Sequence, residues 1–185
     1  PSLMKGYGPL PGNTVFVSPP RCEQCMFGKC SQDCSLECFT LFESAVENQS
    51  GETPAAFLFE PVMGAAGVVV PPKKYLQRAQ EYCRARGILL ACDEILTGLG
   101  RTGKPFAFQH AGLAPDVMTF AKGLGNGFPV TCVAGTEALM TALPYASDGW
   151  NTTTFGGSPL AWQAAAATVS YYRDFQSTLN LDQKY

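Results

Sequence analysis

The amino-acid sequence predicts an α/β fold, with a mostly parallel sheet and helices on both of its faces. Four short apolar segments, at 55–60, 88–94, 117–122 and 130–135, have the length and composition of buried strands. Segments with helical spacing lie between and around them. Strands that alternate with helices are typical of parallel sheets, because one parallel strand reaches the next only through a crossover connection.

Composition and charge exclude several classes of partner. The 185 residues are 46% hydrophobic and 15% charged, with a formal net charge of −2, which is typical of a folded domain. No basic run indicates a nucleic-acid partner, and no apolar stretch reaches the roughly 18 residues that span a membrane. The first residues lack the parts of a signal peptide, so we expect a cytoplasmic protein.

We expect residues 1–54 to form a lead-in loop, a cysteine-rich segment and a helix. Residues 1–20 are rich in proline and glycine, which favours an extended lead-in. The stretch RCEQCMFGKCSQDCSLECF, at 21–39, holds five cysteines. Residues 33–47 follow with helical spacing, and Cys34, Cys38, Leu41, Phe42 and Ala45 fall on one face of that helix.

The cysteines permit three interpretations. Their spacing is compatible with a metal site, whose candidate ligands are Cys22, Cys25, Cys30 and Cys34. Cys34 and Cys38 lie on the apolar face of the predicted helix, where thiols pack as small hydrophobic groups. A redox or disulfide role is the third interpretation. A non-catalytic metal-binding or redox module therefore stands as one hypothesis for the function.

Residues 55–185 carry the predicted α/β core. The strand at 55–60 is followed by Pro71 and Pro72, which introduce a helix that should end at Gly87. A second strand covers 88–94 and a third 117–122. The fourth, at 130–135, precedes a short helix at 137–143. An alanine-rich helix covers 158–173, with Ser158 as its cap.

Three of the predicted strands end in ionisable residues, which are Glu60, Asp93 and Lys122. Ligands of open α/β sheets bind at the carboxyl edge of the strands. A partly desolvated lysine can form a Schiff base, and an aspartate opposite it can hold the pyridine nitrogen of pyridoxal phosphate (PLP). The residues alone leave a second interpretation open, namely a structural ion pair between Asp93 and Lys122.

A nucleotide-binding interpretation of the segment at 98–105 fails. GLGRTGKP, at 98–105, has the glycine and lysine spacing of a phosphate-binding loop. Pro105, however, stands where the Mg²⁺-binding serine or threonine should be. The motif also follows its Asp-Glu strand instead of preceding it, so we reject a nucleoside triphosphatase.

Four segments together resemble a known family. FLFEPVMGAAG, GILLACDEILTGLGRTG, APDVMTFAKGLGNGFPV and TTTFGGSPLAWQAA occur in this order. They resemble the class III (ω-aminotransferase-like) PLP enzymes over roughly residues 55–172. The resemblance implies that residues 55–185 are a PLP-binding α/β core like the large domain of fold-type I enzymes. That core would be incomplete, and the small domain would be absent.

The resemblance also implies roles for four residues. Lys122 would form the Schiff base and carry the proton at the substrate, so it is the predicted catalytic residue. Asp93 would pair with the pyridine nitrogen, and Glu60 would support the polar network beside it. Thr154 would donate to the cofactor phosphate across the interface of a homodimer.

The implied function is a PLP-dependent aminotransferase, or a fragment of one, which moves an amino group from an amine or amino-acid donor to an oxo acceptor. A PLP-dependent aminomutase or decarboxylase is the alternative on the same scaffold. Two positions depart from the family pattern: Leu96 replaces a common glutamine, and Ala65 replaces the glutamate of the ω-specific enzymes. Because parts of the cofactor site are missing, we expect the isolated polypeptide to be poorly active.

Overall fold

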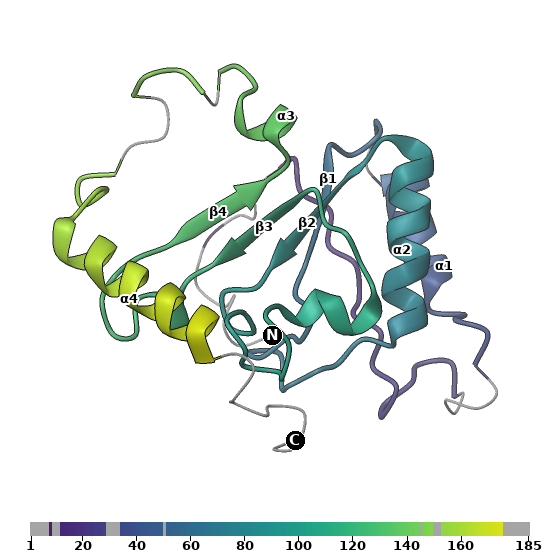
Figure 1. The fold of residues 1–185 in the computed structure, drawn as a ribbon. Helices are drawn as coiled ribbons and strands as arrows, with labels where there is room; N and C mark the ends of the chain where they lie inside the picture. The colour runs from purple at the N-terminus through teal and green to yellow at the C-terminus, as the bar shows by residue number, and fades with distance from the viewer. Residues whose placement is uncertain are drawn as a thin grey trace.

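A computed structural model describes residues 8, 12–28, 34–49, 51–144, 146–149 and 153–175. Its sheet has the order β1-β2-β3-β4, formed by Ala56–Phe59, Leu89–Asp93, Val117–Phe120 and Cys132–Gly135 (Figure 1). β1, β2 and β3 pair in parallel, whereas β4 pairs antiparallel to β3. The predicted mostly parallel sheet is therefore confirmed. The connection from β3 to β4 contains no crossover helix, and an antiparallel partner needs none.

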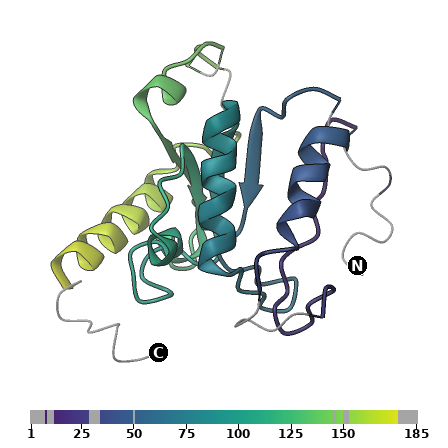
Figure 2. The same ribbon diagram turned by 90° about the vertical axis from the view of Figure 1, so that its right-hand side faces the viewer.

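The helices flank this sheet. The α-helices are α1 (Phe39–Ser44), α2 (Lys73–Arg86), α3 (Glu137–Met140) and α4 (Pro159–Phe175). A π-helical turn, η2 (Ala45–Gln49), continues α1, and two 3₁₀ turns, η3 (Ala107–Ala111) and η4 (Lys122–Leu124), follow β2 and β3. Figure 2 shows α1 and α4 on opposite sides of the strands. No helix in the described part of the chain is long and apolar enough to cross a membrane.

Three expectations need correction. The helix predicted at 33–47 begins only at Phe39, because Leu36 adopts a positive φ of 63° that interrupts helical geometry. The strand predicted at 117–122 ends at Phe120, so Lys122 opens the turn η4. β1 was expected to be buried on both faces, but the Leu58 side chain is 64% exposed. β1 is an edge strand: among the described residues, β2 is the one strand that pairs with it.

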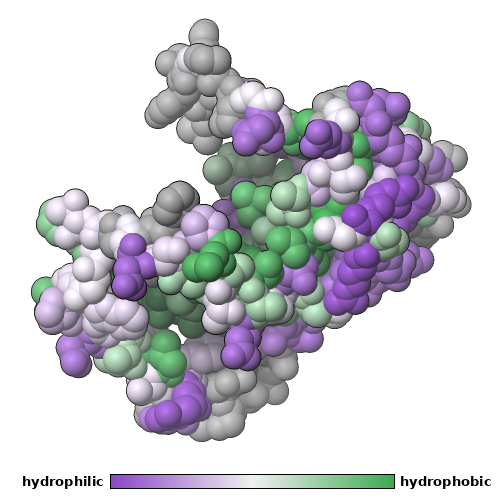
Figure 3. All heavy atoms as spheres, turned by 90° about the horizontal axis from the view of Figure 1, so that it is seen from above, coloured by the Kyte–Doolittle hydropathy of each residue, from purple (hydrophilic) through white to green (hydrophobic). Residues whose placement is uncertain are grey.

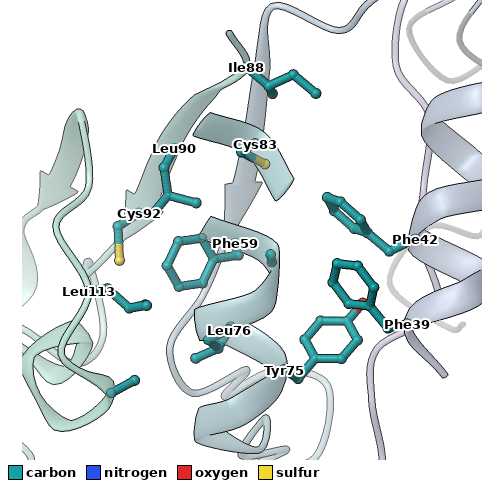
Figure 4. Packing of buried hydrophobic residues seen from close by; sticks show 12 residues of the cluster. Phe39, Phe42, Phe59, Tyr75, Leu76, Cys83, Ile88, Leu90, Cys92 and Leu113 are labelled. Atoms are coloured by element: carbon teal, nitrogen blue, oxygen red, sulfur yellow. The ribbon is translucent and has the colours of Figure 1, made fainter. Parts of the chain in front are cut away.

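An aromatic cluster joins the two N-terminal helices to the sheet. Phe39 and Phe42 extend from α1 toward Tyr75 of α2, and all three are buried (Figure 4). The ring centroids of Phe39 and Phe42 lie 5.2 Å apart, and those of Phe39 and Tyr75 lie 5.3 Å apart. Such ring pairs stabilise a core beyond the area they bury. This cluster therefore anchors α1 although that helix is short.

Polar contacts fix the loop that leads into β3. The Leu90 N–H donates to Oδ2 of Asp116 at 2.7 Å, and the Asp116 N–H returns a bond to the Leu90 carbonyl at 2.9 Å. Gln80 of α2 accepts the Ala114 N–H at 2.7 Å. The start of β3 is thereby attached to both β2 and α2. These bonds determine where the following residues, including Lys122, emerge from the sheet.

Part of the surface is apolar. The most exposed large hydrophobic side chains include Phe155 at 85%, Leu143 at 80% and Val68 at 70%. Figure 3 shows apolar residues gathered across the middle of one face, with hydrophilic residues around them. Extended apolar patches on a protein surface are typical of sites that contact another protein, a membrane or a ligand.

Replacing the central ring of the aromatic cluster should weaken the fold. Because Phe39 is 0% exposed, we expect Phe39→Ala to lower the free energy of unfolding by about 3–5 kcal/mol. Chemical denaturation followed by circular dichroism measures this change. Phe155→Ala, at the 85% exposed ring, is the control and should change stability little. Equal effects of the two substitutions would contradict this description of the core.

The core thiols should be protected from alkylation. Burial raises the pKa of Cys83 to about 11 and also raises that of Cys92, and both side chains are inaccessible. At pH 8 both remain protonated, whereas the reactive form is the thiolate. We expect iodoacetamide to label exposed Cys22 well before either of them, as measured by peptide mass spectrometry. Labelling of Cys92 as fast as Cys22 in the native protein, and not only in denaturant, would refute this prediction.

Candidate functional site

The ends of three parallel strands bring the predicted ionisable residues to one edge of the sheet. Glu60 directly follows β1, Asp93 is the last residue of β2, and Lys122 comes two residues after β3. The register pairs Phe59 with Cys92, and Asp93 with Thr119. The three strand ends therefore lie at the same edge (Figure 1).

A hollow of about 270 Å³ lies at this edge, and both carboxylates line it. Glu60 and Asp93 enter it from β1 and β2, as the sequence predicted. Its other walls are largely apolar and come from β1, from α2 and from the lead-in at 17–20. Lys122 and Thr154 are not among its lining residues. The structure thus brings two of the four predicted site residues into one hollow.

Asp93 offers one unused carboxylate oxygen. Its Oδ1 accepts the Ile95 N–H at 2.9 Å, which fixes the side chain against the turn that follows β2. The described residues provide Oδ2 with no hydrogen-bond donor. The side chain is half-buried, so this oxygen is available to a donor on a ligand in the hollow.

Glu60 organises the loop after β1. Its Oε2 accepts the Gly64 N–H at 3.3 Å, and Met63 pairs with Val69 to close a short hairpin. Gly64 lies directly against the Leu96 side chain, and a Cβ at position 64 would overlap it. Leu96, in the position where the family commonly has glutamine, therefore packs from the loop after β2 against the loop after β1.

Lys122 stands in a strained and open turn. It is exposed, and its φ of 22° lies in a region that side chains other than glycine rarely adopt. The turn is closed by the Leu124 N–H, which donates to the Ala121 carbonyl at 2.6 Å. Across the described part of the chain, no group pairs with the Lys122 ammonium. The alternative interpretation, a structural ion pair with Asp93, is therefore not supported.

Thr154 lies apart from the carboxylates. It is exposed in the turn that precedes α4, and α4 contacts η4, the turn of Lys122. Thr154 therefore lies in the turn that leads into the helix in contact with the turn of Lys122. Its predicted contact with a cofactor phosphate across a subunit interface stays a prediction.

Four of the cysteines share a second cavity of about 220 Å³, lined by Cys22, Cys25, Cys34 and Cys38. Partial burial, and then the neighbouring thiols, raise the pKa of Cys22 and Cys38, which disfavours their reactive thiolate forms. Among the described residues, no three His, Cys, Asp or Glu side chains are arranged to hold a metal ion. Cys30, a further candidate ligand, lies outside the described residues.

Sequence reasoning missed one residue of this edge. Glu94 follows Asp93 and is completely buried, although an unpaired carboxylate is costly to bury. The signal for it in the sequence is the second residue of the Asp-Glu doublet, to which the strand pattern alone gives no role. Its contacts reach the strand that leads to Lys122.

Comparisons with known proteins show which family and which fold this chain resembles. A curated leucine/methionine racemase of Thermococcus litoralis is 41% identical over 155 residues, which are 83% of this chain and 34% of that protein. An (S)-enantioselective ω-transaminase from Thermomicrobium roseum superposes with a TM-score of 0.85 at 33% identity, over 95% of this chain and 40% of that one. An amine transaminase from an uncultivated Pseudomonas species, in its PLP-bound form, superposes with a TM-score of 0.82 at 29% identity. The match covers 93% of this chain and 40% of that one.

The chain thus spans about a third of the length of the curated relative. A family profile described as Aminotransferase class-III matches residues 2–184, nearly the whole chain. The two structural relatives reach similar coverage with the same fold. The chain belongs to the class III aminotransferase family.

Proposed function

We propose that the protein is a PLP-dependent aminotransferase that moves an amino group from an amine or amino acid to an oxo acceptor. The observation that carries the proposal is the strand edge, where Asp93 keeps a free carboxylate oxygen and Lys122 has no described partner. Family membership and the PLP-bound relative support the choice of cofactor. A cytoplasmic location belongs to the same proposal.

The residues present fit the chemistry of this cofactor. PLP, when bound, supplies a ring that withdraws electrons from the substrate Cα. Asp93 Oδ2 would accept a hydrogen bond from the protonated pyridine nitrogen, and its negative charge would stabilise that protonation. Lys122 Nζ, freed when the substrate amine binds, would take the proton from the substrate Cα. Thr154 Oγ1 would donate to the phosphate.

We also propose that the complete enzyme is a homodimer. Exposed apolar side chains such as Phe155, which follows Thr154, support this proposal because water solvates them poorly. A second copy that covers this turn would place Thr154 at the interface. Sedimentation of the purified protein tests the proposal directly.

Amino-acid racemisation is a second candidate, favoured by the 41% identity to the leucine/methionine racemase. The same two residues would serve it, because both reactions remove the proton from the substrate Cα. The reactions differ in their need for an oxo acceptor. Formation of the D-amino acid without any oxo acid would favour the racemase, whereas amino transfer that stops without an acceptor would favour the aminotransferase.

Removal of the Lys122 amine should abolish covalent attachment of the cofactor. The experiment uses the protein with whatever sequence flanks residues 1–185 in its gene. We expect PLP to give a visible absorption band that borohydride removes, and Lys122→Ala to lack it, because Lys122 is the one lysine at the strand edge among the residues that the structure describes. Lys104→Ala, at another exposed loop lysine, is the control and should keep the band. A normal band in Lys122→Ala would refute the assignment.

Neutralising Asp93 should weaken cofactor binding. An amide cannot provide the charge that favours a protonated pyridine nitrogen, and a hydrogen bond to a charged group is worth about 10- to 100-fold in affinity. We therefore expect Asp93→Asn to raise the Kd for PLP by about that factor in equilibrium dialysis. Asp148→Asn, at an exposed aspartate, should leave the Kd unchanged. An unchanged Kd in Asp93→Asn would show that Asp93 does not bind the pyridine nitrogen.

A further inference from the structure

Glu94 is the only carboxylate among the described buried residues, with 0% of its surface exposed. No described cation forms an ion pair with it. Uncharged donors satisfy it instead: the Thr97 hydroxyl donates to Oε2, and the Phe108 N–H donates to Oε1 at 2.8 Å. Burying a carboxylate with neutral partners alone is costly, so its presence at this position calls for a role.

The main chain of Glu94 extends the same network. Its N–H donates to the Thr119 carbonyl of β3 at 2.8 Å, and its carbonyl accepts the Gly98 N–H at 2.9 Å. A Cβ at position 98 would lie 2.9 Å from that carbonyl and 3.4 Å from the Phe106 ring, so the turn is closely packed. All polar groups of Glu94 are therefore used, and they join the turn after β2 to η3 and β3.

Both proposed cofactor residues emerge from this network. Asp93 immediately precedes Glu94, and Lys122 follows Thr119 by three residues. A second contact runs in parallel: Phe106, next to η3, packs edge-on against Phe120 at a centroid distance of 5.3 Å. Glu94 thus connects the residue that would hold the pyridine nitrogen with the strand that presents the reactive lysine.

We propose that Glu94 is a positioning residue, whose buried carboxylate fixes the turn after Asp93 against η3. Through Phe106, which packs on Phe120, it thereby sets the position of Asp93 relative to the Lys122 turn. This inference rests on the proposed function, because it concerns the binding of PLP. Displacement of either group would weaken cofactor binding and change the environment of the lysine nitrogen. Glu94 itself has no exposed surface through which it could touch a ligand.

Variants of Glu94 and Thr97 distinguish the effect of the hydrogen bonds from the effect of the Glu94 charge. In Glu94→Gln, the amide oxygen can still accept from the Phe108 N–H, while the amide NH₂ donates to a Thr97 hydroxyl that now acts as acceptor. Thr97→Val removes that partner and leaves one carboxylate oxygen unsatisfied. The double variant leaves the glutamine NH₂ without a partner. Gln therefore serves as the conservative rescue.

The experiment measures the Kd for PLP and the pH midpoint of the visible band in wild type and the three variants. We expect Glu94→Gln to remain within about threefold of wild type, because both bonds survive. Thr97→Val and the double variant should bind about 10-fold more weakly, with a shifted pH midpoint. Circular dichroism of each variant without PLP confirms that the protein is folded and reports its stability.

Three results would overturn the proposed role of Glu94. A change in folding stability with unchanged Kd and pH midpoint would show that Glu94 only stabilises the core, and would overturn the proposal. The proposal would also be overturned if Glu94→Gln bound PLP as poorly as Thr97→Val does. A wild-type protein that binds no PLP would instead overturn the proposed function, and this proposal with it.

Discussion

The parallel hydrogen bonding of β2 with its two neighbours is the constraint on which the candidate site depends. Parallel strands end at the same edge, so the pairing of Phe59 with Cys92, and of Asp93 with Thr119, brings three loops together. A register shift of one residue would turn every side chain of β2 to the other face and remove Asp93 from the hollow. The chemistry proposed for this family member follows from that register.

The packing around the sheet serves to hold this register. α2 attaches to the entrance of β3 through Gln80, and Asp116 binds the main chain of Leu90. At the opposite end of the same strands, Glu94 gathers the loops through hydrogen bonds alone. Side-chain hydrogen bonds therefore hold these strands at both ends.

Local sequence patterns predicted most helices and strands, because the composition of a strand and the residue that ends a helix depend on neighbouring residues. Gly87 ends α2 with a φ of 69°, as expected, and the four strands appear within one or two residues of their predicted bounds. The later start of α1 was not predictable, because Cys34 and Cys38 fit the helical period while Leu36 adopts a positive φ. Glu94 was missed because two of its three partners, Phe108 and Thr119, are distant in sequence, and the nearby Thr97 does not by itself indicate burial. The roles of Lys122 and Thr154 came from the family resemblance.

A crystal structure of the protein with PLP would test the central claim most directly. We expect a covalent bond between Lys122 Nζ and the cofactor, with Asp93 Oδ2 within hydrogen-bond distance of the pyridine nitrogen. We also expect Glu94 to keep its bonds to Thr97 and Phe108. Cofactor attached to another lysine, or a pyridine nitrogen that faces away from Asp93, would contradict the account.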